Sequence, residues 1–409
     1  MTPSILAFGL LVLFHVGMYY VGWDWHIKSP HSSRAIEPWM RLVSPWRMDL
    51  LFLVSGAATA FMLGRRGAAA GLLRERASRL LWPLLFGVLV IVPPQSYLEV
   101  ARRFSYGGSY LDFMRLYLTG YGGFCRAGGA CLILPTWNHL WYLPYLFAYT
   151  LALWLVVRRW PQSIDRWGAA AGTALRGARL WVVPVALLAL TRISLSARFP
   201  ATHALVGDWF LHTQYFAMFL FGACFARADG MQARMPALRW TALAGAVAAW
   251  ALLLAPAPGA AASMWPQIGR ALAYSIQQWC AIVAALGFAH RHLNIDSRAR
   301  RYLTEAVFPV YILHQTLTLL LAQALLPWAL APGVEAPLLV AGTFGLSFLG
   351  FEGVRRAVWL RPVFGLRRAG PVAPHAQENS ATVAPARPTR QPEPVPPDPG
   401  PQSLSAPRR

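Results

Sequence analysis

The sequence contains few charged residues and almost no lysine. Charged side chains make up 13% of its 409 residues, whereas soluble globular proteins carry about 25%. Lys28 is the single lysine, so arginine supplies nearly all of the positive charge. Because so few charged groups cannot coat a soluble chain of this size, two or three soluble domains are excluded. Disorder over most of the chain is excluded too, since aromatic residues make up 13% of it.

Several patterns typical of catalytic and metal sites are also missing. The four cysteines form no CxxC pair and no Cys/His spacing of the kind that binds zinc. No GxSxG elbow, Walker loop, HExxH motif or GxGxxG motif stands in a matching context. We therefore expect no metal site. The net charge of +21 does not indicate nucleic-acid binding, because the arginines lie in short clusters between apolar stretches.

Long apolar runs fill most of the chain. Hydrophobic residues make up 56% of the sequence, and its mean hydropathy is +0.41. A helix that spans a bilayer needs about 20 mostly apolar residues, and ten segments meet this description. These candidate spans cover residues 3–22, 46–64, 79–97, 137–157, 179–194, 208–226, 238–256, 266–289, 302–325 and 337–358. The sequence therefore predicts an all-α, polytopic membrane helix bundle with about ten transmembrane helices.

Basic residues gather in every second loop between these spans. In the C-terminal half, loops 227–239, 291–301 and 355–368 are rich in arginine. The alternating loops 257–265 and 326–336 contain no lysine or arginine. Loops with an excess of Lys and Arg stay in the cytoplasm, so both termini are predicted to be cytoplasmic.

The two ends of the chain differ from the rest. Residues 369–409 are rich in Pro, Ala, Ser and Gln and have almost no large apolar residues. Such a segment cannot bury a core, so we expect a membrane domain over 1–368 and a disordered Pro-rich cytoplasmic tail over 369–409. The first span has no basic residue before it and no A-x-A cleavage site after it, which favours an anchored helix over a signal peptide.

Three histidines lie within or at the edge of the apolar spans, where polar groups are costly and mark functional candidates. His15 lies about two thirds of the way along the first span, toward its extracytoplasmic end. Its imidazole titrates near neutral pH and can act as a general base, or it can be a hydrogen-bonded structural group. His139 lies at the mouth of the fourth span and His314 within the ninth, and either can also be structural.

Polar residues alternate with tryptophans directly after the first span. The segment WDWHIK contains Asp24, His26 and Lys28. Indole rings favour the membrane interface, so this can be a plain interfacial loop. It can also be one wall of a carbohydrate site, since aromatic faces stack on sugars while His and Asp bind hydroxyl groups.

The second span begins with two charged residues. Arg47 and Asp49 stand at its start and can form an interfacial ion pair. Ser55 and Gly56 lie within it, and small residues of this kind allow another helix to approach closely.

Two arginines precede the third span on one helical face. Arg76 and Arg79 are three residues apart and face the cytoplasm by the loop-charge argument. Guanidinium groups bind phosphates through paired donors, so these arginines can hold a phosphorylated ligand. They can also be ordinary topology-setting residues.

The cysteines fall into two groups. Cys125 and Cys131 lie in the long extracytoplasmic loop before the fourth span, where an oxidising compartment permits a disulfide, although two free thiols are equally compatible with the sequence. Cys224 and Cys280 fall within spans and are expected to be packing residues.

Several of these segments, taken in order, resemble one family. After His15 come W-x-W-H, the stretch RMDLLFLVSG, the R-x-x-R pair, NHLWYLPYL, AHRHLN and FPVYILHQTLTL. This series resembles the membrane-bound acyltransferase-3 family, and within it the enzymes that succinylate osmoregulated periplasmic glucans. The match runs from about His15 to about Leu360. One position departs from the family pattern: the usual arginine about eleven residues before the histidine is Ser4 here. Either the true start lies upstream of Met1, which the missing N-terminal charge favours, or this member has lost the arginine, which would put its activity in doubt.

The resemblance implies an acyltransferase of the bacterial inner membrane. Its substrates would be a cytoplasmic acyl-CoA, succinyl-CoA above all, and the hydroxyl groups of a periplasmic glucan. It implies His15 as the catalytic residue and places the Arg76 and Arg79 pair on the acyl-donor side. Supporting or acceptor-side positions implied by the motifs are His26, Arg47, Asp49, Ser55, His139, Trp141 and His314.

Other functions stay open at this stage. The acceptor can be lipopolysaccharide or another envelope polysaccharide, and the acyl group can be acetyl. Arg47 or Arg192 can pair with a distal acyl carboxylate, although nothing in the sequence specifies one. A polysaccharide transporter would require paired discontinuous helices, which the sequence does not show. A non-catalytic scaffold would tolerate replacement of His15.

Overall fold

The computed structural model describes residues 2–64, 68–126, 131–228, 230–256, 264–293 and 295–367. Within these ranges the chain is helical and contains no β-strand, only an isolated bridge between Cys125 and Cys131. The predicted tail at 369–409 and the loop arginines Arg65, Arg66 and Arg368 lie outside the described residues. The side chain of Ser4 is also outside them.

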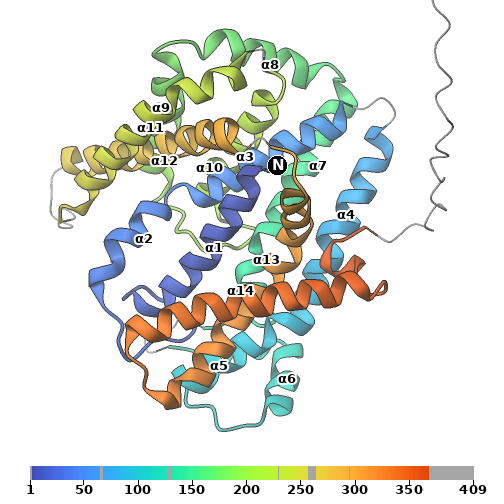
Figure 1. Cartoon of the computed structure of the whole chain (residues 1–409), viewed down its shortest axis with the longest axis vertical. Helices are drawn as coiled ribbons and strands as arrows, with labels where there is room; N and C mark the ends of the chain where they lie inside the picture. The colour runs from blue at the N-terminus through green and yellow to red at the C-terminus, as the bar shows by residue number, and fades with distance from the viewer. Residues whose placement is uncertain are drawn as a thin grey trace, which may run out of the picture. The chain divides into compact units, whose positions relative to one another are not determined.

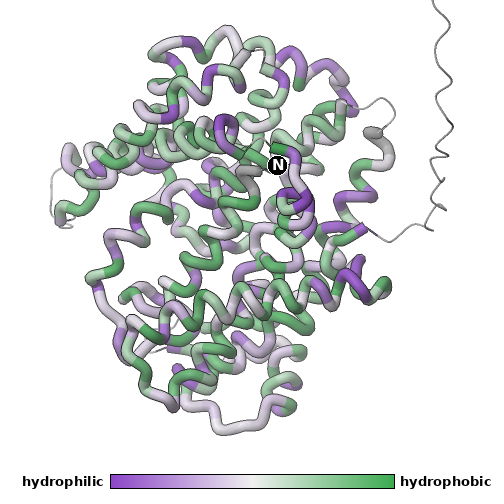
Figure 2. Tube along the Cα trace, in the orientation of Figure 1, coloured by the Kyte–Doolittle hydropathy of each residue, from purple (hydrophilic) through white to green (hydrophobic). Residues whose placement is uncertain are grey.

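A helix stands at each of the ten predicted spans. In chain order these helices are α1 (Thr2–Tyr20), α3 (Arg47–Leu63), α4 (Ala68–Phe86), α7 (Tyr142–Arg159), α9 (Arg179–Leu195), α10 (Trp209–Phe225), α11 (Met231–Leu254), α12 (Met264–His292), α13 (Arg298–Leu325) and α14 (Pro332–Arg356). Long apolar stretches run along them, with short hydrophilic segments between (Figure 2).

Seven helical segments of the described chain are long and apolar enough to cross a membrane, or eight if a bent pair counts as one span. The bent pair is α8 (Ser163–Ala174) with α9, which meet at 113°. The first helix is apolar but shorter over its described part, Ile5–Tyr20. These lengths confirm a polytopic membrane helix bundle, while the count of ten spans and the cytoplasmic position of the termini stay predictions.

The third predicted span is not one continuous helix. α4 passes through a π-helical turn (Gly87–Ile91), and a new helix, α5 (Pro93–Arg103), starts after Val92. Proline at the first helical positions lacks the N–H that would continue the earlier ladder, so the helix restarts there. Two side chains donate hydrogen bonds to carbonyl oxygens freed near the break. The Thr316 hydroxyl donates to the Ile91 carbonyl at 2.7 Å, and the Tyr117 hydroxyl donates to the Val88 carbonyl at 2.9 Å.

Short helices occupy the loops that the sequence analysis left without structure. They are η1 (Arg34–Ile36), α2 (Glu37–Val43), α6 (Tyr110–Leu118), α8, η4 (Leu326–Trp328) and η5 (Pro362–Phe364). A further short helix, η3 (Asn138–Trp141), forms the start of the fourth predicted span, directly before α7. Lys28 donates to the carbonyl oxygens of Met18 at 2.6 Å and Val21 at 2.5 Å, so it caps the C-terminal end of α1.

The helix α3 crosses α10 at two glycines. A Cβ atom on Gly56 would lie 1.8 Å from the carbonyl oxygen of Phe219, and one on Gly222 would lie 1.8 Å from that of Leu53. The backbones therefore touch, as the small-residue pattern at Ser55 and Gly56 predicts. This crossing fixes α3, while α1 packs against both α3 and α13 in the middle of the bundle (Figure 1).

A disulfide joins Cys125 to Cys131, which resolves the alternative left open by the sequence. Disulfides persist in oxidising compartments, so the bond supports an extracytoplasmic position for the loop between α6 and η3. Cys224 and Cys280 are free thiols; Cys280 is buried and Cys224 is partly buried, in keeping with packing roles.

Candidate active site

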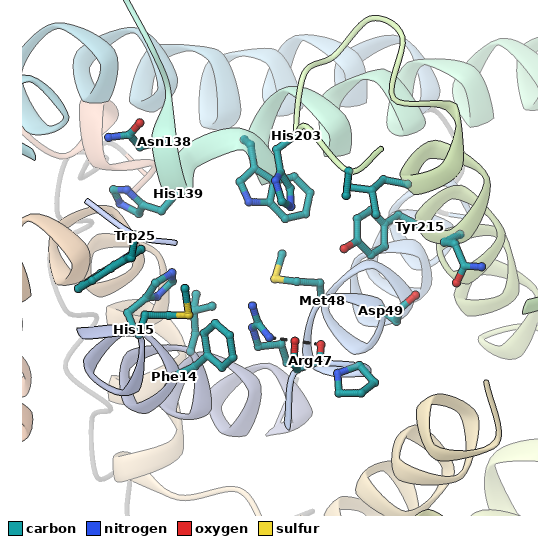
Figure 3. Close-up of a pocket in the computed structure, with 18 of the residues that line it drawn as sticks. Phe14, His15, Trp25, Arg47, Met48, Asp49, Asn138, His139, His203 and Tyr215 are labelled. Carbon is teal, nitrogen blue, oxygen red and sulfur yellow. Dashed lines mark hydrogen bonds between the residues drawn. The ribbon is translucent and has the colours of Figure 1, made fainter. Parts of the chain in front are cut away.

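A cavity of about 550 Å³ opens between α1, α3, α10, α12, η3 and α13. Figure 3 shows His15, Trp25 and His139 on one side of it, Arg47 and Phe14 next to them, and Tyr215 across the cavity. Most of the sequence-predicted site residues line it: His15, His26, Arg47, Asp49, His139 and Trp141. Segments far apart in the sequence therefore meet at one place.

His15 is held by the second buried histidine. The Nδ1 atom of His15 lies 2.9 Å from Nε2 of His314, and the other ring nitrogen of His314 lies 2.7 Å from the carbonyl oxygen of Tyr311. The carbonyl can only accept, so Nδ1 of His314 carries a proton and donates it. In a neutral ring Nε2 of His314 then accepts, and Nδ1 of His15 must donate. The nitrogen left on His15 to take a proton is Nε2.

The third histidine of this cluster is fixed in a similar way. His139 Nε2 lies 3.1 Å from the carbonyl oxygen of Ile312, and its Nδ1 lies 3.3 Å from the Nε2 atom of Gln95. Gln95 also donates to Thr316 at 2.6 Å and accepts from Gln315 at 2.9 Å. The helix restart at α5 places Gln95 here, fully buried. The network holds η3 against α13 and keeps His139 neutral by making it both donor and acceptor.

His26 forms a pair with a buried carboxylate. Its Nδ1 atom lies 2.5 Å from Glu99 Oε2, and Gln315 donates to its Nε2 at 3.0 Å. The other carboxylate oxygen of Glu99, Oε1, lies 3.2 Å from the guanidinium group of Arg103. The same guanidinium donates to the Asp24 carboxylate at 2.6 Å. The loop after α1 is thereby tied to α5 and α13, so the interfacial segment predicted from the tryptophans is one wall of the cavity.

Aromatic rings form the opposite wall. The ring of Trp141 lies 5.5 Å from that of Tyr215 in a stacked arrangement and 4.4 Å from the imidazole of His203. His203 stands in the loop between α9 and α10, where burial lowers the pKa of its imidazole below the usual value; Arg47 lowers this pKa further and Asp208 opposes both. The ring is therefore neutral at neutral pH.

Two arginines border the cavity without an ion pair to any carboxylate among the described residues. The Cζ atom of Arg47 lies 3.3 Å from the centroid of the Phe14 ring, and its guanidinium donates to the Ser44 carbonyl at 3.2 Å. Arg192 lies 3.7 Å from the Tyr274 ring centroid and donates to Gln278 at 3.2 Å. The Nε atoms of both arginines are buried without a hydrogen-bond partner in the described chain.

Arg47 and Asp49 do not form the ion pair that their spacing suggested. Asp49 is buried, with 3% of its surface exposed, and its Oδ1 atom has no hydrogen-bond partner among the described residues. Residues two apart on a helix point in different directions, which explains why this possible ion pair is absent. Ser55 lines neither this cavity nor the one described next; its hydroxyl lies 2.5 Å from the hydroxyl of Tyr142.

A second cavity of about 610 Å³ lies where α4, α13 and the η5 segment meet. Arginine dominates its wall, with Arg76, Arg79, Arg300, Arg301, Arg361 and Arg367. Three carboxylates pair with these arginines. Glu75 lies 3.7 Å from Arg79 and 3.5 Å from Arg367, and Glu305 lies 3.4 Å from Arg361. Asp296 lies 2.8 Å from Arg300 and 3.1 Å from Arg301. Positive charge exceeds negative charge, and guanidinium forks suit phosphate groups. Arg76 and Arg79 thus belong to a larger cluster than the sequence indicated.

The sequence analysis missed the amide side chains that organise the first cavity. Gln95, Gln278 and Gln214 are almost fully buried, and the last two bond each other at 3.2 Å. A polar residue within an apolar span is a functional candidate by the same argument that selected His15. Glutamines within the spans were therefore an available signal.

Comparison with known proteins gives one match. Residues 5–352 fit a family model described as an acyltransferase domain. No curated protein and no solved structure matches the chain.

Proposed function

Because the chain belongs to the acyltransferase-3 family, we propose that it transfers a succinyl group from acyl-CoA to hydroxyl groups of a periplasmic glucan, with His15 as general base. The family makes the chain a multi-pass membrane acyltransferase that acts on hydroxyl groups, rather than a transporter or a scaffold. The succinyl group, the glucan and the inner membrane rest on the sequence motifs, which resemble those of glucans biosynthesis protein C.

The observation that carries the proposal is the fixed imidazole of His15. Its Nδ1 proton is directed to His314, so Nε2 is the nitrogen that can take a proton, and His15 lines a cavity large enough for a sugar ring and a short acyl group. A general base of this kind contributes roughly 10²–10⁴-fold to a transfer reaction.

The reaction then proceeds by direct transfer. A sugar hydroxyl oxygen attacks the thioester carbonyl carbon while Nε2 of His15 takes the hydroxyl proton. A C–O bond forms and the C–S bond breaks, and the departing thiolate receives the proton that His15 carried. The products are a sugar ester and free coenzyme A, and the neutral imidazole is restored.

The arginine-lined cavity supports acyl-CoA as donor. Coenzyme A carries several phosphates, and six arginines with an excess of positive charge line that cavity. The two cavities share no lining residue, but a layer of aromatic rings on α13 lies between them. Tyr311 lines the first cavity, and its ring lies 6.0 Å from that of Phe308, which lines the second. We propose that the phosphates of acyl-CoA bind these arginines and that the arm carrying the acyl group extends along this layer toward His15.

Mass spectrometry of periplasmic glucans from cells with and without this protein tests the substrate assignment. We expect the succinyl mass increment to disappear when the protein is absent and to return with the wild-type chain, but not with His15→Ala. An unchanged glucan profile contradicts the glucan assignment. Acylation of another envelope polysaccharide or of lipopolysaccharide, found in the same cells, would identify the acceptor instead.

His314 is a positioning residue, because it acts through His15. Replacing it with leucine removes the acceptor that fixes the His15 tautomer, and a buried donor left without its partner costs about 1–3 kcal/mol, or about 10–100-fold. We expect this loss in kcat with KM nearly unchanged, and partial recovery in His314→Gln, whose amide oxygen can accept the same proton. Steady-state kinetics of the purified variants measure both constants. Equal losses in the two variants would indicate a merely structural role.

A further inference from the structure

The active-site cavity has positive charge that the described chain does not neutralise. Each guanidinium has five N–H donors. Among the described residues, Arg47 directs one to the Ser44 carbonyl and Arg192 directs one to Gln278, and neither donates to a further acceptor there. The aromatic faces of Phe14 and Tyr274 lie against them, which accommodates the cations but leaves their remaining donors unused.

The acidic residues of the cavity do not balance these charges. Asp24 is bound by two arginines outside the cavity wall, Arg103 at 2.6 Å and Arg126 at 2.8 Å. Asp49 is the other carboxyl group on the wall, and it forms no ion pair with either cation among the described residues. Even with Asp49 ionised, one positive charge remains without a counterpart.

An uncompensated cation within a membrane bundle is costly, and such residues generally pair with each other, with backbone or with a substrate. A bound anion would supply the missing charge here. The phosphates of the donor have their own cluster of arginines in the second cavity, which shares no residue with this one. The remaining anion that a short acyl donor can bring to His15 is a carboxylate at its far end.

We propose that Arg47 and Arg192 bind the distal carboxylate of the acyl group, so that this site selects dicarboxylic acyl groups over neutral ones of the same length. The guanidinium fork matches a carboxylate through two parallel hydrogen bonds. The inference rests on the proposed function and adds to it the residues that set donor specificity. Gln278 orients Arg192 through its 3.2 Å bond.

Donor competition with the purified full-length protein tests the selectivity. Succinyl-CoA is compared with butyryl-CoA, in which a methyl group replaces the carboxylate, on a neutral glucan oligosaccharide. We expect Arg192→Gln and Arg47→Gln to lower kcat/KM for succinyl-CoA by about 10–100-fold and to leave that for butyryl-CoA within about twofold. Arg198→Gln, an exposed arginine six residues along the chain, is the matched control. Equal losses for the two donors overturn the proposal.

A binding measurement separates this inference from the proposed reaction. In the His15→Ala protein no transfer is expected, but the two arginines are intact. Succinate should raise the thermal unfolding temperature of this protein, the neutral succinamide should not, and Arg192→Gln should remove the difference. Succinate stabilisation without any transfer by the wild type would retain the anion site and refute the acyltransfer chemistry. Absence of stabilisation refutes the anion site.

The carboxylate can also belong to the acceptor. A neutral glucan oligosaccharide and one that contains a glucuronic acid residue are therefore compared with butyryl-CoA as donor. If Arg192→Gln lowers transfer only to the acidic acceptor, the arginines bind the sugar acid, and the donor assignment is wrong. We expect the variant to treat the two acceptors alike.

Discussion

Replacing His15 with alanine is expected to lower kcat/KM for acyl transfer by about a thousandfold or more. The change removes the Nε2 atom of His15, which the His314 contact leaves as the proton acceptor of a residue that lines the cavity. Loss of a general base costs on the order of 10²–10⁴-fold. The Nε2 atom of His314 also loses its partner, so His15→Gln, whose amide can still donate to it, should fold better and be equally inactive.

Kinetics of purified protein with a defined donor and acceptor measure this effect. His31→Ala is the matched control, because His31 is an exposed histidine in the loop after α1. Size-exclusion profiles of the variants show that the loss is chemical rather than a failure to fold. Retention of activity in a folded His15→Ala protein would mean that another residue is the general base. His26 would be the first candidate, because it lies 2.5 Å from Glu99 and lines the same cavity.

The double substitution Arg76→Gln and Arg79→Gln is expected to raise the KM for acyl-CoA by about 100-fold or more. Each arginine would lose a charge-assisted bond to a phosphate, which is worth about 1.5–3 kcal/mol. If the two arginines act independently, these free-energy losses add, so the two fold-increases in KM multiply. The value of kcat should change little, because these residues lie in the second cavity, away from His15.

A donor without phosphates makes this test specific. Acyl-pantetheine keeps the thioester and the arm but has no phosphoadenosine, so its KM should already be high and should not rise further in the double variant. Arg74→Gln is the control, since Arg74 is an exposed arginine on the same helix that does not line the cavity. An equal effect of the double variant on both donors would contradict phosphate binding and favour a structural role, such as the 3.1 Å bond from Arg76 to Thr59.

Local features of the sequence predicted the helical segments and several members of the site. Apolar runs alone placed a helix at all ten ranges, because the bilayer imposes a length and a polarity that a sequence displays directly. The prolines in the third span were visible, but the restart at Pro93 was not, since only the neighbouring Thr316 and Tyr117 make the freed carbonyl groups tolerable.

Pairwise relations could not be predicted in the same way. Arg47 and Asp49 looked like an ion pair because they are close in the chain, yet helix geometry turns them apart. Arg300 and Arg361 were assigned to different basic loops by topology, whereas the fold brings both to the cavity of Arg76. Gln95 was passed over because its partners, His139 and Gln315, come from distant segments.

Apolar runs of membrane length are enough to define this protein as a helical membrane bundle. They also make His15 a candidate, because a polar group in an apolar run can be recognised without any knowledge of its neighbours. The chemistry available to His15 depends on how the helices pack. Its contact with His314 joins residues 299 positions apart, and that contact selects the tautomer that leaves Nε2 as the base. The charge surplus at Arg47 and Arg192 is likewise a property of the assembled cavity, because pairing depends on distances that only packing fixes.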